Sequence, residues 1–592
     1  MRRPTAMLLG ACVVLLAACT PPGLPEPIAP SGPTSLPSSP PPAGTVVIGL
    51  DGLAGRITGF NPYSIADFSL ASQAATSLVL PSAFLVGADG RPAADPDVID
   101  DATVTSQSPF TVTYTLDRKA SWSDGTPITA EDFSYLRDQL LVQPGTIGSA
   151  GYRLITAITS RDAGKTVQVQ FAAAYPDWQT LFSPLLPSHL MKDSPGGWTD
   201  ALDNDIPITG NRYRMTSYDP VTGQVNLARN DKYWGAQPGP VAVALRLGDP
   251  AELLAAFTRG DVQALWLAPN STLASSLEAA VPADRRTVVP VPESTQLVFN
   301  TTAGVTAEPT IRMAIAAAID LGVVAQDLTA GWPSGGAMVT SQVTLPAQTP
   351  DDDAPPTPPI STDDQSAAVD LLTSAGYTRD GLYATKEGEV LRLTLGYPSG
   401  DLRLAAAART LQAELGLIGI EVDLLADAAS NLIETRMAAG SFDLALVRLP
   451  RGYANPTSAA SAFGCPPDDV LGVGSTVIET APASAAPDPT PNTTAGPVAP
   501  GSTTTAPVPR TGNLSGYCAA GTQRDLVDAL TGQGSSAFAD PTLWVDLPVL
   551  PLLQQSAVFA VSESLRTVLA GEQRGWMWTG PLIGMPGWPA TG

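Results

Sequence analysis

The stretch from 111 to 136 (TVTYTLDRKASWSDGTPITAEDFSYL) constrains the fold most, because it specifies a strand, a turn and a helix in immediate succession. Its first apolar residues alternate with threonines, which is the period of a half-buried strand: Val112, Tyr114 and Leu116. The Asp-Gly pair at 124–125 supplies turn chemistry. Thr129 predicts a helix N-cap, and Asp132 places negative charge at the positive end of the helix dipole. The chain therefore contains at least one mixed α/β unit.

The N-terminus predicts secretion and lipid attachment. Two arginines precede an apolar run over 7–18, which is shorter than the roughly 20 residues of a bilayer span but suits a signal-peptide core. The run ends in LAAC at 16–19, which resembles the bacterial lipobox, where the cysteine receives a diacylglyceryl group. We expect residues 1–18 to form the signal peptide and Cys19 to be lipidated. The alternative is an uncleaved anchor or a coincidental cysteine.

Residues 19–43 predict a tether between the lipid and the folded protein. They are rich in Pro and Ser and cannot bury apolar surface, so they favour a stiff, extended chain. The folded part is then expected at the extracytoplasmic face of the cell membrane, held there by its diacylglyceryl anchor.

Length and charge bound the function. With 592 residues the chain is too long for one core, and two or three lobes are expected. The net charge of -24, from 32 basic and 56 acidic residues, argues against nucleic acid, since phosphate contacts need clustered Lys and Arg. An enzyme is disfavoured because the chain has no GxSxG or HExxH motif and only His189, which we expect to orient a turn. We predict no catalytic residue, no cofactor and no metal site.

The cysteines agree with an oxidising compartment. Cys12 leaves with the signal peptide, which leaves Cys465 and Cys518 as a pair expected to form a disulfide. Between them, residues 476–511 are a low-complexity run of Pro, Thr and Ala, predicted to be disordered or polyproline-like. The bridge would close the base of this insertion.

Several segments resemble one known family, the extracellular solute-binding proteins of peptide-type ABC importers (family 5). The matching segments are 111–136, the hairpin and "RN..YW" signature within 206–246, the strand and helix of 296–320, and the elements of 363–424 and 441–446. The resemblance implies a two-lobed α/β fold like that of periplasmic binding proteins, in its large peptide-binding form. It places the first lobe at 44–295 with an extra subdomain at about 64–200, the second at 296–545, and a return to the first lobe over 546–592.

Two further local expectations come from apolar patterns. Residues 311–320 predict a helix with Arg312 and Asp320 outside its buried face. Residues 546–562 predict two strands.

The family pattern breaks after 441–446. Peptide-binding members carry a Trp and an acidic "DYPDP"-like segment there, whereas this chain has VRLPRGYANP at 447–456. Without that acidic group, an anionic or sugar-bearing ligand is favoured over free peptides, since arginine pairs with anions; the alternative is that both arginines are solvated. The resemblance also places an "NP" segment at the lip of the ligand cleft. The candidate cleft residues are therefore Phe60, Asn61, Arg448, Arg451, Tyr453 and Asn455.

The lipobox, the Pro-rich tether and the Cys-flanked insertion together resemble actinobacterial lipoprotein members of this family. That resemblance implies a monomeric, non-transporting protein that influences phosphatidylinositol mannoside and lipoarabinomannan synthesis, with a membrane-embedded mannosyltransferase as its partner. The alternative is the binding lipoprotein of an ABC importer, which delivers a peptide or glycoconjugate to its permease.

Overall fold

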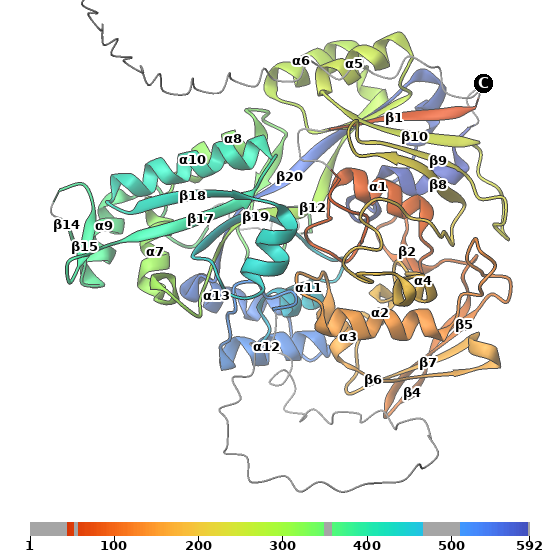
Figure 1. The fold of residues 1–592 in the computed structure, drawn as a ribbon, viewed down its shortest axis with the longest axis horizontal. Helices are drawn as coiled ribbons and strands as arrows, with labels where there is room; N and C mark the ends of the chain where they lie inside the picture. The colour runs from red at the N-terminus through yellow and green to blue at the C-terminus, as the bar shows by residue number, and fades with distance from the viewer. Residues whose placement is uncertain (1–43, 52–56, 349–357, 380, 466–509, 590–592) are drawn as a thin grey trace, which may run out of the picture. The chain divides into compact units, whose positions relative to one another are not determined.

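An 11-stranded mixed sheet organises the chain (Figure 1). The computed structural model describes residues 44–51, 57–348, 358–379, 381–465 and 510–589. The strands follow the order β18 (Glu421–Asp427), β17 (Arg392–Pro398), β19 (Leu444–Pro450), β12 (Arg286–Phe299), β20 (Val549–Val561), β11 (Ala264–Leu267), β1 (Thr45–Asp51), β10 (Ala242–Gly248), β9 (Gln224–Arg229) and β8 (Tyr213–Asp219), with β13 (Gly336–Met338) beside β20.

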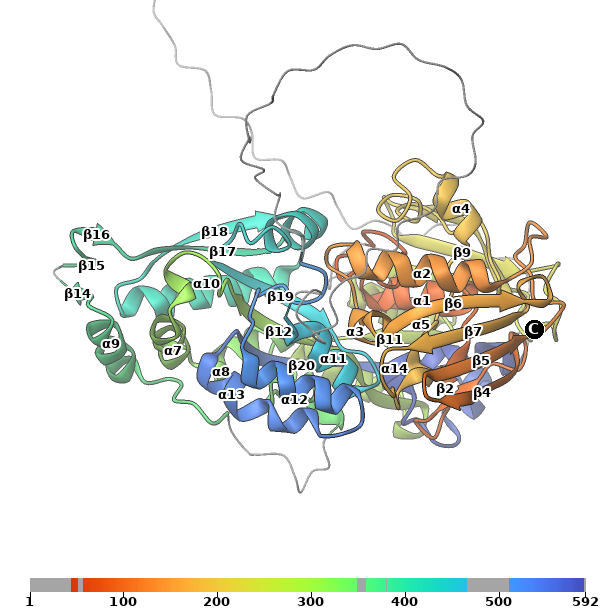
Figure 2. The same cartoon turned by 90° about the horizontal axis from the view of Figure 1, so that it is seen from below.

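Two hydrophobic cores share this sheet and define two lobes. The first core surrounds β1 and β8–β11, and the second surrounds β17–β19 and the helices that cover them. First-lobe helices are α1 (Leu70–Val79), α5 (Pro250–Arg259), α6 (Ser271–Ala280) and α14 (Trp576–Thr579). Second-lobe helices are α7 (Pro309–Ala318), α8 (Leu321–Thr329), α9 (Gln365–Ser374), α10 (Leu402–Leu417) and α13 (Asp540–Asp546). The helices α11 (Asn455–Phe463) and α12 (Ala520–Leu530) follow β19 in the chain, but their buried residues, such as Phe463 and Leu526, belong to the first core. A small sheet of β14 (Thr378–Arg379), β15 (Ala384–Lys386) and β16 (Glu389–Val390) extends this lobe (Figure 2).

A four-stranded antiparallel sheet packs into the first core. Its order is β4 (Ile99–Gln107), β5 (Phe110–Leu116), β7 (Thr166–Phe171) and β6 (Ile155–Arg161). The helices α2 (Ala130–Val142), α3 (Ser149–Arg153) and α4 (Ser188–Asp193) and the ribbon of β2 (Phe84–Val86) and β3 (Pro92–Ala94) accompany it. It lies within the range 64–200 in which the resemblance implies an extra subdomain, and the bounds of that subdomain stay a prediction.

The stretch 111–136 folds as predicted. Every second residue of β5 is buried, including Val112, Tyr114 and Leu116. Thr129 caps α2 in a capping box, in which its hydroxyl accepts from the first turn and the Asp132 carboxylate accepts from the Thr129 N–H at 3.0 Å. His189 contacts the turn, with 2.8 Å between its Nε2 and the Oδ2 of Asp124. This histidine therefore orients a turn.

The strand pair β12–β20 joins the two lobes. One end of β20 pairs with β11 of the first lobe, while the opposite end of β12 pairs with β19 of the second. The register of β12 against β20 shifts between Pro290 and Ser294, so the ladder is interrupted midway. The implied boundary at 295/296 lies inside β12. The prediction of two strands over 546–562 is wrong, because Pro551 sits beside a second register shift and one continuous strand accommodates it.

Cys465 and Cys518 are bonded in the structure, 53 positions apart in sequence. The predicted insertion at 476–511 lies outside the described residues except for its last two, Arg510 and Thr511, whose hydrogen bonds are given below. The predicted signal peptide (1–18), Cys19 and the tether (19–43) also lie outside the described residues. Within the described ranges, no helix combines the length and apolar character needed to span a bilayer.

Disrupting the disulfide tests its contribution to stability. In the entropic model, closing a loop of this length stabilises the fold by about 4 kcal/mol. We expect a Cys465→Ala/Cys518→Ala variant to lose up to this amount in urea unfolding, and thiol titration of the denatured, unreduced mature protein to find no free thiol. Two titratable thiols would contradict the bridge.

Candidate functional site

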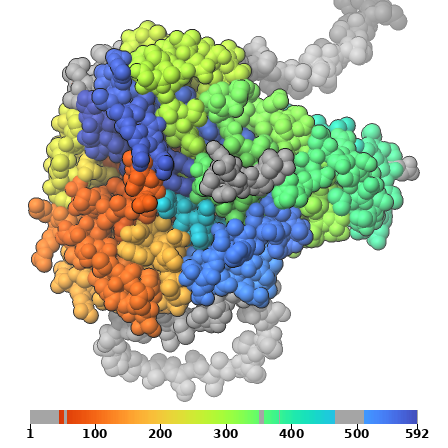
Figure 3. Space-filling model, turned by 180° about the vertical axis from the view of Figure 1, so that it is seen from behind, coloured from red at the N-terminus to blue at the C-terminus, as the bar shows by residue number. Residues whose placement is uncertain are grey.

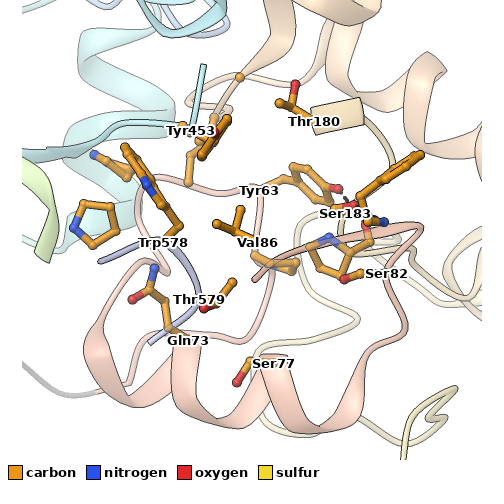
Figure 4. A pocket seen from close by; sticks show the side chains of 18 of the residues that line it. Tyr63, Gln73, Ser77, Ser82, Val86, Thr180, Ser183, Tyr453, Trp578 and Thr579 are labelled. Atoms are coloured by element: carbon orange, nitrogen blue, oxygen red, sulfur yellow. Dashed lines mark hydrogen bonds between the residues drawn. The ribbon is translucent and has the colours of Figure 1, made fainter. Parts of the chain in front are cut away.

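A cavity of about 280 Å³ lies between the two lobes (Figure 4). Its walls come from five parts of the chain that are distant in sequence: first-lobe segments within 61–92 and 147–184, Pro292 of β12, residues 450–458 from the end of β19 onwards, and the C-terminal residues Trp578, Thr579 and Ile583. Ligand sites of two-lobed proteins form at such junctions. The joining strand and both lobes therefore contribute to one site.

The lining of this cavity is almost uncharged. Arg451 is the only charged residue among the described residues that line it, and the others are mainly Ser, Thr, Gln and apolar or aromatic side chains. The Arg451 guanidinium is engaged by the protein, since Nη2 donates to the carbonyl oxygen of Gln342 at 2.9 Å and the group lies over the Phe463 ring. Its Nη1 is buried and has no hydrogen-bond partner among the described residues. Burial lowers the pKa of Arg451 to about 10, so it stays a cation at neutral pH.

The structure divides the predicted cleft residues. Asn61, Arg451 and Tyr453 line the cavity. Asn61 also fixes its own loop, because Nδ2 donates to the Trp198 carbonyl and Oδ1 accepts from the Tyr63 N–H. Asn455 does not line the cavity but begins α11.

Phe60 and Arg448 do not line the cavity and contact other parts of the protein. Phe60 is fully buried and packs edge-on against Tyr218. Arg448 forms an ion pair with Asp401, with 2.9 Å between Nη1 and Oδ2, and its side chain is 12% exposed. Arg448 is thus neither solvated nor free for an anion, since the carboxylate of Asp401 already pairs with it.

The ion pair of Arg448 belongs to a buried charged cluster near the joining strand. Arg403 of α10 donates to the carbonyl of Ala268 and lies 4.0 Å from Asp51 at the end of β1, so it connects the second lobe to the first. Glu293 of β12 is buried nearby, and burial raises its pKa to about 7. Arg403 and Arg448 therefore face carboxylates at the junction of the lobes, and Glu293 lies beside them.

A second set of contacts, which we call the seam, joins α11 and its neighbours to the first lobe. Tyr175 and Thr457 share a hydrogen bond of 2.7 Å between their hydroxyls, and the Ala150 N–H donates to Ser461 at 3.0 Å. Figure 3 shows the cyan α11 region between the orange first lobe and the blue α12. Further seam bonds run from Ser64 to Glu434, from Arg153 to Thr511, and from the N–H groups of Gly145 and Thr146 to the carbonyls of Arg510 and Thr511.

Sequence reasoning missed the C-terminal wall of the cavity. Trp578 contacts Tyr453 with 5.6 Å between ring centroids and an interplanar angle of 71°. The signal was the aromatic-rich stretch 575–588 (GWMWTGPLIGMPGW), which carries three tryptophans close together. The position of Gln73 of α1 in the cavity wall was also not predicted, because its local sequence is the same as that expected for a solvent-exposed helix residue. Across the described residues, no three His, Cys, Asp or Glu side chains are placed to hold a metal ion.

The fold and the interlobe cavity define a class of protein, and comparison with known proteins supports it. The chain belongs to the bacterial extracellular solute-binding proteins of family 5, whose family model ("family 5 Middle") matches residues 94–469. Proteins of this family bind small ligands outside the cytoplasm and work with ABC permeases. Relatives that include an oligopeptide-binding protein of Mycobacterium tuberculosis are named as binding proteins.

One relative of Mycobacterium tuberculosis is the probable monoacyl phosphatidylinositol tetramannoside-binding protein LpqW, 30% identical over 97% of this chain and 98% of that protein. Among solved structures, the oligopeptide-binding protein AppA of Bacillus subtilis with a nonapeptide has a TM-score of 0.69 at 15% identity, covering 94% of this chain and 100% of AppA. The periplasmic EDTA-binding protein EppA has a TM-score of 0.65 at 21% identity, with coverages of 94% and 98%. The predicted two-lobed α/β fold is confirmed.

The buried carboxyl of Asp67, beside the cavity, gives a pH test. Burial raises its pKa to about 7, opposed by the Asn61 N–H and aided by Glu434 and Asp203. The folded protein therefore binds this proton more tightly than the unfolded chain. The contribution of Asp67 to the free energy of unfolding is fully present below about pH 4 and is lost as the pH rises through about 7.

Replacing the carboxyl of Asp67 with an amide removes this loss of stability at high pH. We expect Asp67→Asn to be more stable than the wild type at pH 8, by at most on the order of 4 kcal/mol, and the difference to vanish towards pH 4. Urea unfolding at both pH values measures it, with Asp193→Asn on the exposed end of α4 as the control. A difference that does not change with pH would refute the assignment.

Proposed function

We propose that this chain is a lipid-anchored extracytoplasmic binding protein that holds an uncharged part of a mannosylated phosphatidylinositol and influences phosphatidylinositol mannoside and lipoarabinomannan synthesis. The observation that carries the proposal is the interlobe cavity, in which no described lining residue is acidic and the single cation is shielded. The printed name of the mannoside-binding relative supports the ligand class. The anchor rests on Cys19 and the lipobox at 16–19.

The cavity is poorly suited to free peptides. A free peptide carries an ammonium and a carboxylate, and burying either without an opposite charge costs several kcal/mol. The described lining offers no carboxylate for the ammonium, and the Arg451 guanidinium is turned towards the protein. An uncharged ligand segment avoids both costs.

The seam supports a role other than repeated delivery to a permease. An importer's binding protein must open and close, with the ligand supplying the difference in free energy between the two states. Here hydrogen bonds between protein groups contribute to joining the lobes, including the one between the buried hydroxyls of Tyr175 and Thr457. We therefore favour a regulatory lipoprotein acting on a membrane-embedded mannosyltransferase. The alternative, an importer's binding lipoprotein for a peptide or glycoconjugate, is supported by what the family does.

Deleting the gene separates these functions. We expect altered amounts of phosphatidylinositol mannosides and lipoarabinomannan in extracted envelope lipids, with unchanged uptake of labelled peptides and sugars. A copy with Cys19→Ala should fail to restore the lipids, because it lacks the anchor. Unchanged mannolipids together with lost uptake would favour the importer.

Loosening the seam tests its role in closure. Thr457→Val leaves the buried Tyr175 hydroxyl with only Thr180, at 3.4 Å, as a partner. An unsatisfied buried hydroxyl costs about 1–3 kcal/mol, so we expect faster hydrogen exchange in α3 and α11 and a larger radius of gyration by X-ray scattering. Thr258→Val on the exposed face of α5 is the matched control. Identical exchange in the two variants would show that the seam does not hold the lobes together.

A further inference from the structure

We infer that the interlobe cavity is a subsite for a single pyranose ring, which stacks on the Tyr453–Trp578 corner while Gln73 and Ser82 bind its hydroxyls. This inference rests on the proposed function and makes it specific, because it names the part of the ligand that the cavity holds. No charged group takes part.

The aromatic corner is built from two distant segments. Tyr453 lies between β19 and α11 of the second lobe, and Trp578 lies in α14 near the C-terminus. Their rings meet edge to face at 5.6 Å, so they form two walls at an angle and do not cover each other. Such walls offer flat apolar faces with a polar tip, which suits the C–H face of a sugar ring.

Most hydroxyls of the lining are already used by the protein. The hydroxyls of Thr76, Ser77, Thr180, Thr457 and Thr579 all form hydrogen bonds within the chain. These groups shape the wall and contribute little to ligand recognition.

A few polar side chains of the lining have no partner within the described part of the chain, although water can reach them. They are Gln73, Ser82, Gln179, Tyr453 through its hydroxyl, and Trp578 through its indole N–H. Together they provide both donors and acceptors. A polyhydroxylated ligand would use these groups, whereas a purely apolar occupant would leave them desolvated and unpaired, at a cost for each.

The side chains approach the space from different directions (Figure 4). Tyr453 and Trp578 lie on one side, Ser82 and Tyr63 lie on the other, and Gln73 extends from α1 below. The aromatic rings of Tyr453 and Trp578 therefore lie opposite Ser82 and above Gln73. A ring held against the wall can present its hydroxyl edge to Gln73 and Ser82.

The size of the cavity sets the extent of the ligand that is enclosed. At about 280 Å³ the cavity is at the lower limit of the roughly 300–1,000 Å³ of sites for drug-sized molecules. One ring fits this space, and the remaining sugars and the phosphate must lie outside it. This agrees with the shielded Arg451, which has no anion to bind inside.

Binding of two soluble probes to the full mature protein in detergent tests the inference. The first probe is the deacylated, water-soluble headgroup of a phosphatidylinositol mannoside, measured by titration calorimetry; the second is methyl α-D-mannopyranoside, measured by saturation-transfer NMR. We expect both to bind, and the monosaccharide to compete with the headgroup.

Variants locate the site. Trp578→Leu and Gln73→Leu should each weaken headgroup binding about tenfold, through loss of stacking and of hydrogen bonds respectively. Trp578→Phe should recover part of the loss, because it keeps a flat ring. Tyr383→Leu is the control and should bind like the wild type, because it removes an aromatic ring that is 38% exposed and lies just before β15, away from the cavity. Equal melting temperatures show that each variant is folded.

The outcomes distinguish the pyranose subsite from the proposed function. If the wild type binds the headgroup but Trp578→Leu and Gln73→Leu bind it equally well, or the monosaccharide does not compete, the pyranose subsite is wrong and the proposed function stands. If the wild type binds neither probe, the mannolipid-binding function fails and the subsite fails with it.

Discussion

The antiparallel pairing of β12 with β20 is the interaction on which the rest of the structure depends. It is the sheet contact shared by both lobes, and each lobe adds its own strands to one end of the pair. The register shift after Pro290 concentrates the irregularity of this long ladder in a few residues. Pro292 lies in that interval, lines the cavity, and accepts a hydrogen bond from the Arg451 N–H at 2.7 Å. The site therefore sits on the joint between the lobes.

Local sequence rules predicted those elements whose causes are local. The alternation in β5, the Thr129 cap and the Asp124 turn each depend on residues within one short stretch, and each appears in the structure as expected. The overall class followed because several such stretches occur in the order typical of one family.

Sequence patterns failed where long-range contacts decide the outcome. Arg312 was expected outside the buried face of its helix, yet it is 3% exposed. Its guanidinium donates to carbonyl oxygens at 306–307 and 546–547, and the second pair lies more than two hundred positions away. Arg448 is similar, because Asp401 pairs with it from another element. No local pattern shows that a charged side chain will find such partners. The same holds for Trp578, which reaches the cavity only because the chain returns to the first lobe.

The position of the site on the joint has a mechanical consequence. Strands β17 and β18 lie two and three positions from β12 at one end of the sheet, and β9 and β8 lie five and six positions from it on the other side. A ligand that shifts the backbone slightly at Pro292 acts where the two lobes are joined. A small rotation of one lobe about this joint moves its outermost strands much further than it moves the cavity walls. A partner that contacts those edges could sense occupancy without touching the ligand.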